Sequence, residues 1–548
     1  MAYNSCVKNN KKTQLDYTAF GVAYQLRLPL DIEIMIPQND PVRLLDAVIG
    51  SLDLSCLYST YQRTGRMQYS PGVLLKVIVY AYMRHIFSSR DIEAACRENI
   101  NFMFLLQGSP PPDHNTIARF RRDHLSHLSD EITGQLTRLL IDLGEVSFEE
   151  SAVFIDGTKI EANANKYSFV FKKRVRNNFD KLLESIRTQL PDLLESIDLK
   201  WRIPDRITVK KIKRLKKRIH DKIDEEGIVF VYGTGKRKHQ LQRVFETVSA
   251  WLRRMQQYTY DLHVCGERNS YSKTDHDATF MHMKEDYMRN GQLKPEYNVN
   301  VATVNEYVIA SYISADRTDT RTFIPFTEKL LRQDYDIRRL VADSGYESEE
   351  NYKYAEEHKR ISLFVKPANH EQKKKKKYRT DISRRENMAY DAENDTYTCA
   401  NGKILEVTEV KRTKSDSGYP IETTIYECKE CDGCPLKEKC IKSTSKTPLS
   451  ERSKRLYVSK YFQAQRELME AKINTEEGIL LRINRSIQSE GVFAFVKEDL
   501  LFRRFMMRGT KNVAVEWMLL TFAYNVLKLH SKMQNNRLGE HLKIPKAS

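Results

Sequence analysis

Apolar positions in residues 1–148 recur every three to four residues, the spacing of amphipathic helices. The most apolar stretch, residues 73–87, follows Pro71-Gly72 and is predicted to be a helix. A second helix is expected over residues 92–98 and a third over residues 114–125. The first part of the chain is therefore predicted to be all-helical.

The third of these helices is strongly basic, since it carries Arg119, Arg121 and Arg122. Short helices that end in a basic member are typical of helix-turn-helix DNA readers. An ordinary helical bundle with a solvated basic face would give the same pattern. The sequence favours the DNA reader and leaves the bundle open.

Alternating apolar and polar positions then predict strands, beginning with a short apolar strand over residues 152–155. Residues 297–304 alternate with period two, and Asn305-Glu306 is suited to a hairpin turn before a strand over residues 307–313. A helix is expected over residues 323–331 and a buried strand over residues 338–342. Strands mixed with helices predict an α/β fold.

Charged, helix-periodic and cysteine-bearing stretches interrupt this pattern, and the chain ends in helical segments over residues 483–497 and 513–529. The last of these contains Glu516 and Asn525, so it is predicted to be a buried helix rather than a membrane span. The following division is expected: a helical DNA-binding domain (1–148), a sheet core (149–176, 263–345 and 481–532), a helical insertion (177–262), a basic linker with a cysteine-rich insertion (346–480) and a polar, frayed tail (533–548).

Charge indicates the class of partner. The 548 residues include 90 Lys and Arg against 73 Asp and Glu, a formal net charge of +17. A surplus of this size favours a polyanion, nucleic acid first. Candidate phosphate contacts lie in residues 210–218 and 373–377, and in a loop that holds Arg503, Arg504 and Arg508. No export signal is visible at the start, and no phosphate-binding glycine loop supports an ATPase.

Three acids form the candidate catalytic set. Asp156 and Asp343 each follow an apolar strand, where α/β folds place functional groups, and two such carboxylates side by side suit a magnesium ion. Either aspartate alone could equally be a turn-forming residue. Glu490 lies in an apolar helix, where a carboxylate is costly unless paired or metal-bound, and Lys497 follows two helical turns later on the same face.

Five clustered cysteines indicate a second metal site. Two-residue spacings let thiolates chelate one tetrahedral ion, which predicts structural zinc. An iron–sulfur cluster or reduced, metal-free thiols are the alternatives. Four ligands suffice, so one cysteine is spare; the expected ligands are Cys428, Cys431, Cys434 and Cys440, with Cys399 as the alternative ligand.

The order strand-Asp156-Gly157-Thr158, Ala342-Asp343-Ser344-Gly345-Tyr346 and Glu490-Gly491-Val492-Phe493 with Lys497 resembles the DDE transposases of bacterial insertion sequences. The segments 70–72 and 113–121 are similar to the DNA-binding region of that family. The chain departs from the pattern before the glutamate, where Ile483 and Ser486 replace a tyrosine and an arginine. Arg485 is adjacent, but it is expected to point about 100° away.

The resemblance implies an RNase H-like core in which Asp156, Asp343 and Glu490 hold two Mg²⁺ or Mn²⁺ ions and Lys497 contacts a phosphate. It implies binding of terminal inverted repeats, cleavage of the ends and joining to target DNA. A homodimer or larger assembly on DNA, acting in the cytoplasm at the nucleoid with no membrane partner, is expected. A nuclease that does not join ends and a non-catalytic DNA-binding derivative remain as alternatives.

Overall fold

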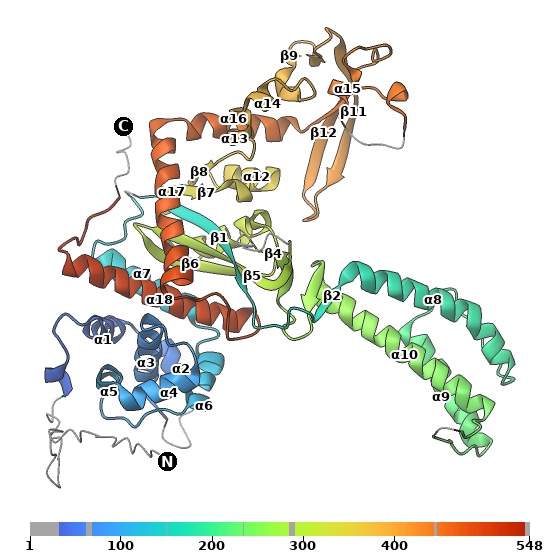
Figure 1. The fold of residues 1–548 in the computed structure, drawn as a ribbon, viewed down its shortest axis with the longest axis horizontal. Helices are drawn as coiled ribbons and strands as arrows, with labels where there is room; N and C mark the ends of the chain where they lie inside the picture. The colour runs from blue at the N-terminus through green and yellow to red at the C-terminus, as the bar shows by residue number, and fades with distance from the viewer. Residues whose placement is uncertain are drawn as a thin grey trace, which may run out of the picture.

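The computed structural model describes residues 32–61, 68–149, 151–233, 235–283, 291–442 and 447–542 (Figure 1). Parts of the predicted N-terminal domain and tail, residues 1–31 and 543–548, lie outside the described residues. The fold is a mixed α/β structure, as the strand and helix patterns predict.

Helices make up the described N-terminal part, as expected. The apolar stretch after Ser70 forms α3 (Pro71–Met83), which is buried along almost its whole length. The basic helix begins at α6 (His114–Arg119), where Asp113 caps the helix by accepting a 2.7 Å hydrogen bond from the Thr116 amide. It then continues as a π-helical turn, Phe120–His124. The remaining helices here are α1 (Pro41–Ser51), α2 (Ser55–Ser59), α4 (Ser89–Glu98), α5 (Ile100–Leu106) and α7 (Ser129–Asp142).

A six-stranded sheet forms the centre of the molecule. Its long antiparallel part contains β1 (Val153–Glu161), β5 (Leu293–Val304) and β6 (Tyr307–Ser314), with β5 between the other two. β7 (Arg339–Ala342) and β8 (Ser362–Val365) then run parallel to β1. The order across the sheet is therefore β6-β5-β1-β7-β8, and β4 (Thr279–His282) pairs with the start of β5.

The turn between β5 and β6 is the one predicted from sequence. Asn305 and Glu306 both have positive φ, at 50° and 71°, as a tight two-residue hairpin requires.

Helices cover the sheet and connect it to the N-terminal part. α17 (Glu476–Ala494) packs against β1, β5 and β7, and it continues as a π-helical turn over Phe495–Asp499. α18 (Thr510–Gln534) packs against β6 and α3, so it joins the sheet to the N-terminal helices. The predicted helix at 323–331 is α11 (Phe323–Leu331).

The interpretation of residues 346–480 as only a linker with a cysteine-rich insertion is wrong. This range also supplies β8 to the main sheet, together with α12 (Glu349–Glu357) and α16 (Lys460–Ile473). The cysteine-bearing part is a separate five-stranded sheet of order β13-β12-β11-β10-β9. Its strands are β9 (Ala389–Asp391), β10 (Thr396–Thr398), β11 (Ile404–Lys414), β12 (Pro420–Glu427) and β13 (Arg455–Val458).

The helical insertion projects from the body as a long arm (Figure 1). It contains α8 (Lys172–Glu195), α9 (Val209–Glu225) and α10 (Gln240–Cys265), close to the predicted limits. A two-stranded ribbon, β2 (Phe169–Phe171) with β3 (Ser270–Ser272), forms its base.

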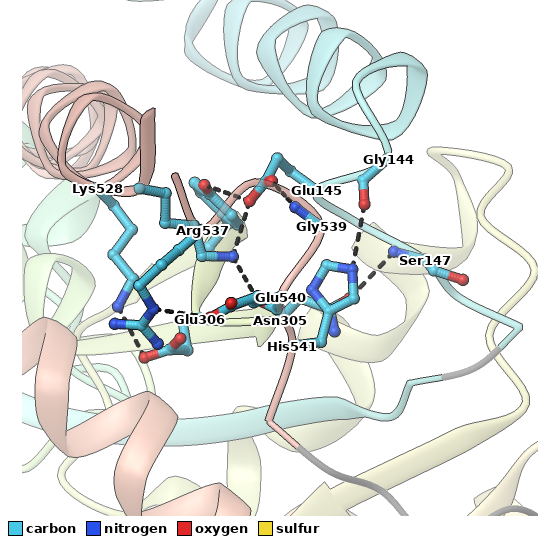
Figure 2. A network of polar contacts seen from close by, with 12 residues as sticks. Gly144, Glu145, Ser147, Asn305, Glu306, Lys528, Arg537, Gly539, Glu540 and His541 are labelled. Atoms are coloured by element: carbon cyan, nitrogen blue, oxygen red, sulfur yellow. Dashed lines mark hydrogen bonds and ion pairs between the residues drawn. The ribbon is translucent and has the colours of Figure 1, made fainter. Parts of the chain in front are cut away.

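The described part of the tail is docked rather than frayed. The Gly539 amide donates a 2.6 Å hydrogen bond to Glu145, and a ring nitrogen of His541 lies 3.1 Å from the Gly144 carbonyl oxygen (Figure 2). Glu145 is fully buried and pairs with Lys532 at 2.7 Å. The buried charge therefore holds the polar tail in place. None of the described helices is long and apolar enough to cross a membrane.

Candidate active site

Asp156 and Asp343 lie on neighbouring parallel strands. Asp156 is within β1 and is 7% exposed, while Asp343 directly follows β7. The register pairs Ile155 with Ala342, which are the residues just before the two aspartates. The parallel pairing therefore brings the two carboxylates to the same region of the sheet. The prediction that Asp156 lies past the end of its strand is wrong, because antiparallel pairing with β5 extends β1 to Glu161.

Both aspartates are fixed by backbone amides. Oδ1 of Asp156 accepts a 2.8 Å hydrogen bond from the Gly157 amide, and Oδ1 of Asp343 accepts one of the same length from the Gly345 amide. Asp343 thereby caps the 3₁₀ turn Ser344–Tyr346. The turn-forming reading of Asp343 is thus correct locally, and it leaves the other carboxylate oxygen available for chemistry.

A third aspartate, Asp319, lies at the same place. An ideal Cβ on Gly157 would come 2.8 Å from Oδ1 of Asp319, and one on Gly345 would come 3.1 Å from Oδ2. The Asp319 carboxylate thus fills the space that these two glycines leave open. Neither glycine has a positive φ, so the need is for space and not for backbone freedom.

Buried polar groups support this carboxylate. Asn298 donates a 2.7 Å hydrogen bond to Oδ1 of Asp319, and the oxygen of Asn300 accepts from Thr322 at 2.9 Å and from the Tyr346 hydroxyl at 2.5 Å. Burial raises the pKa of Tyr346, and the negative charges of Asp319, Asp156 and Asp343 raise it further. One buried hydroxyl therefore lies close to all three aspartates.

Arg485 is the cation of the site. Its guanidinium donates a 2.8 Å hydrogen bond to Oδ2 of Asp156. The expectation that Arg485 points away from the site is therefore wrong. The reason is that α17 packs against the sheet through Leu481, which contacts the even-numbered face of β1, and Arg485 lies one turn later.

Glu490 lies on the same helix but is exposed. It follows Arg485 by five residues, a rotation of about 140° around the helix, so the two side chains leave on different sides. Within the described residues, no hydrogen bond or ion pair joins Glu490 to Asp156 or Asp343. The convergence of all three predicted acids therefore stays a prediction.

Lys497 lies beyond the end of α17, in the π-helical turn. Burial raises the pKa of Glu296 on β5, and the positive charge of Lys497 is among those that oppose this rise; Glu296 pairs with Glu161 at the end of β1. Lys497 is therefore close to the far end of β1, and its predicted contact with a phosphate is untested.

The described residues contain no ready-made cage of three or more His, Cys, Asp or Glu side chains for a metal ion. Magnesium, however, is commonly held by one or two carboxylates, waters and substrate phosphates instead of an all-protein cage. Asp156 and Asp343 supply the hard oxygen donors for such a site. The donor set thus fits Mg²⁺ or Mn²⁺.

The predicted DNA-contact arginines divide into exposed and buried ones. Arg121 is only 5% exposed, and its guanidinium donates to the Tyr82 hydroxyl, the Phe87 carbonyl and Ser89. It stabilises the helical packing, so its prediction as a DNA contact is wrong. Exposed side chains are found for Arg119, Arg122, Arg503, Arg504 and Arg508.

Two of these exposed arginines line one recess. Arg122 comes from the basic helix and Arg508 from the loop before α18, and Arg90 joins them around a recess of about 530 Å³. Arg508 also donates a 2.8 Å hydrogen bond to the Asn163 carbonyl just beyond β1. The N-terminal basic helix and the arginine loop, far apart in sequence, therefore share one surface.

The five clustered cysteines come together in the small sheet unit. Cys428 is buried in its core, and Cys399, Cys431 and Cys440 pack against it. Burial raises the pKa of the Cys440 thiol, and the charges of Cys399, Cys431 and Cys434 raise it further. The five cysteines therefore lie in one part of this unit, but among the described residues no three of them are arranged to hold a metal ion.

Two matches connect this arrangement to known proteins. Residues 398–530, which include the cysteine cluster and Glu490, match a family model described as a transposase DDE domain. Residues 30–123, most of the N-terminal helices, match one described as a transposase domain (DUF772). No curated protein matches the chain. The two family matches, in an order that places a transposase domain before a DDE domain, indicate a DDE-type transposase of an insertion-sequence family.

Proposed function

We propose that the chain binds the terminal inverted repeats of an insertion sequence, cleaves the DNA strands at its ends and joins them to target DNA. The observation that carries the proposal is that Asp156, within β1, lies beside Asp343, which directly follows the parallel strand β7, and that both are close to Tyr346. The strand order β6-β5-β1-β7-β8, antiparallel and then parallel, supports an RNase H-like core around this pair.

Asp156 and Asp343 would hold the divalent ions, Mg²⁺ or Mn²⁺, two of them in the full reaction centre. Bound there, the ions would activate the attacking water or 3′-hydroxyl and stabilise the leaving oxygen. The Asp319 carboxylate fills the space beside Gly157 and Gly345, next to the two aspartates. Arg485 neutralises Asp156 until the substrate is in place.

Glu490 and Lys497 complete the centre in this proposal, Glu490 as the third carboxylate and Lys497 as a phosphate contact. Glu490 is exposed, as a carboxylate that meets a DNA substrate has to be. Glu490→Gln should then abolish cleavage, whereas Glu498→Gln, an exposed glutamate in the following turn, should not.

Arg119 and Arg122 with Arg503, Arg504 and Arg508 would bind the phosphates of the element end along the shared surface. The partner would be terminal-repeat and target DNA in the cytoplasm, at the nucleoid. Because both element ends must be held together for transposition, the chain would act as a homodimer or larger assembly on DNA.

The cysteine cluster would bind one structural zinc ion through four thiolates. Close thiols with two-residue spacings fit the tetrahedral sulfur site that zinc prefers. The ion would stabilise the small sheet unit, whose core otherwise contains few apolar residues.

The test uses the full-length protein, duplex DNA that carries the element ends, and Mg²⁺. Asp156→Asn and Asp343→Asn should each reduce cleavage by more than about 100-fold, because outer-shell partners of a metal ligand alone are worth 10–100-fold. Asp142→Asn, an exposed aspartate on α7, is the control and should leave cleavage unchanged.

Joined products decide between transposase and nuclease. Cleavage without joining of the ends to a target plasmid would indicate a nuclease. DNA binding with no cleavage in Mg²⁺ or Mn²⁺ would indicate a non-catalytic derivative. Full cleavage by both aspartate variants would overturn the catalytic assignment.

A further inference from the structure

The helical arm enters and leaves the body at one point. Phe171 of β2 pairs with Ser270 of β3, so the chain departs into α8 and returns from α10 side by side. The arm also has its own hydrophobic core, made by Leu182, Ile186, Leu215, Ile219 and Val248 among others, separate from the core of the body. It is therefore a self-contained element on a two-stranded stem.

Most of the chain's excess charge lies in this arm. Residues 172–265 contain 23 Lys and Arg against 12 Asp and Glu, an excess of 11, and the whole chain has an excess of 17. About a sixth of the sequence thus holds well over half of the net charge. Crowding like charges onto one element destabilises it unless a polyanion is present.

The charge is organised on one face of α9. Lys210, Lys213, Arg214, Lys217 and Arg218 recur at three- and four-residue spacings and are all exposed. We call these five residues the α9 stripe. Side chains on the opposite face, which include Ile212, Leu215, Ile219 and Ile223, are buried in the arm core. The stripe therefore faces solvent.

Acidic side chains do not neutralise the stripe. α9 contains no acid before Asp221, and among the described residues no carboxylate pairs with any of the five stripe residues. Arg218 is held over the Trp201 ring at 6.0 Å, which orients the guanidinium and keeps its charge. Like charges four residues apart on a helix cost stability, so an anion bound along the stripe would offset that cost.

A recess connects the arm base to the catalytic region. It measures about 430 Å³, and its lining holds the cations Lys172, Arg268, Arg317 and Arg321 together with the acids Glu267, Asp316 and Asp416. Cations thus outnumber acids by four to three along this path from the arm base toward Asp319.

We propose that the arm binds the phosphate backbone of duplex DNA that flanks the cleaved phosphate. This inference rests on the proposed function. α10, the longest arm helix, has 26 residues, and a helix of that length spans about 39 Å at 1.5 Å per residue. At 3.4 Å per base pair this corresponds to about 11 base pairs, one turn of duplex. The contacts are to phosphates, so they add affinity without sequence preference.

A matched pair of variants tests the stripe. Lys213→Gln/Lys217→Gln removes two charges from α9, and Lys359→Gln/Arg360→Gln removes two exposed charges just after α12. The first should weaken binding to end-containing duplex several-fold and reduce the slope of log K against log salt by about 1–2, since each phosphate contact contributes about 0.9. The second should change neither.

Excision of the arm tests its reach. Replacing residues 172–269 by Asn-Gly joins Phe171 to Ser270 through a two-residue turn and preserves the β2–β3 pairing. The excised protein should lose nuclease protection over about one helical turn beside the cleavage site while it still protects the terminal repeat.

The outcomes separate this inference from the proposed function. If the full chain neither binds nor cleaves element ends, the proposed function fails. If the full chain cleaves, but the α9 and α12 variants have equal salt slopes and excision leaves the footprint unchanged, the arm inference alone is wrong. If the arm instead joins two copies of the chain, the excised protein should keep the wild-type footprint and sediment as a smaller assembly. That outcome would also overturn the arm inference.

Discussion

Arg485 donates a hydrogen bond of 2.8 Å to Oδ2 of Asp156, although 329 positions separate them in the chain. Both side chains are mostly buried, at 17% and 10% exposure. The guanidinium thus occupies an oxygen that a divalent cation would also use, and the two cations compete for one carboxylate.

Arg485→Gln should therefore change the metal dependence of cleavage. Because the guanidinium then no longer competes for Oδ2 of Asp156, the Mg²⁺ concentration at half-maximal rate should fall several-fold. The maximal rate should also fall, because Asp156 loses the contact that orients it. A metal titration of the cleavage rate checks both effects, with Arg482→Gln on the same helix as the control. An unchanged half-maximal concentration would show that Arg485 does not compete with the ion.

Adding a methyl group at Gly157 should disturb the site through Asp319. The new Cβ would lie 2.8 Å from the Asp319 carboxylate, closer than real contacts allow. Gly157→Ala should reduce stability by about 1–3 kcal/mol, the usual cost of overpacking, and should slow cleavage. Denaturant unfolding measures the first effect and a single-turnover assay the second.

A double-mutant cycle tests the cause. In Gly157→Ala/Asp319→Ala the closest clash is absent and only the 3.2 Å approach to Oδ1 of Asn300 remains, so the cost of the glycine substitution should shrink to under half. Gly50→Ala on α1, where nothing lies within 4 Å, is the control and should not destabilise the protein. Strictly additive losses would show that Asp319 is not what excludes the methyl group.

The two aspartates could be placed beside buried strands from sequence because the signal, an apolar run followed by Asp, is local. The prediction of a strand end holds for Asp343, which follows β7, but not for Asp156, because pairing with β5 carries β1 on to Glu161. The hairpin at Asn305-Glu306 and the helix Phe323–Leu331 are local in the same sense.

Asp319, Arg485 and β8 could not be found this way because long-range packing positions them. The face of α17 that meets the sheet is set by Leu481 against Phe154 and Val341, not by the spacing of Glu490 and Lys497. β8 is only four residues long and lies in a polar stretch. The one sequence signal for Asp319 is indirect: Asp156 and Asp343 are each followed within two residues by a glycine that makes room for its carboxylate.

The buried pair of Glu145 and Lys532 should control stability at low pH. Burial acts to raise the pKa of Glu145, but hydrogen bonds from Lys532, Gly539 and Tyr307 outweigh it and hold this pKa below its usual value. The pair therefore stabilises the fold above the usual glutamate pKa, and this contribution is lost as the pH falls through the folded-state pKa.

Lys532→Met should cost about 3–5 kcal/mol at pH 7, because it leaves Glu145 buried and unpaired. Urea unfolding at pH 7 and pH 4 measures the cost, which should shrink at the lower pH. Glu145→Gln/Lys532→Met should be less harmful than the single variant, since no lone charge remains. Equal stability of the single variant and wild type at pH 7 would contradict the role of the pair.

Glu296 should make the fold weaker at alkaline pH. Burial raises its pKa to about 8, against the opposing charges of Lys159 and Lys294, and neither carboxylate oxygen has a hydrogen-bond partner among the described residues. Between about pH 4.5 and pH 8 the folded state keeps a proton that the unfolded state releases. Stability is therefore highest below this window and falls as the pH rises through it.

Glu296→Gln should remove this dependence and stabilise the protein at pH 8 by up to a few kcal/mol. Denaturant midpoints at pH 5.5 and pH 8 check the prediction, with Glu393→Gln in the exposed β9–β10 turn as the control. A variant that is no more stable than wild type at pH 8 would show that Glu296 carries its charge without penalty.

Zinc content should depend on three cysteines and on only one of the remaining two. Cys431, Cys434 and Cys440 belong to both expected ligand sets, and each Cys→Ser change there should lose the metal and destabilise the small sheet unit. Cys428 is buried beside Cys431, and the charge of Cys399 helps to raise the pKa of the Cys440 thiol. Each therefore neighbours one of the three shared ligands and is a candidate for the fourth. Metal analysis of the purified Cys399→Ser and Cys428→Ser proteins identifies the fourth ligand, with Cys56→Ser in α2 as the control.

Because the cysteine-bearing unit is a separate sheet, chelation of the metal should unfold it while the main sheet keeps its hydrogen-exchange protection. Full protection of both sheets after chelation, or stoichiometric iron in place of zinc, would refute a structural zinc ion.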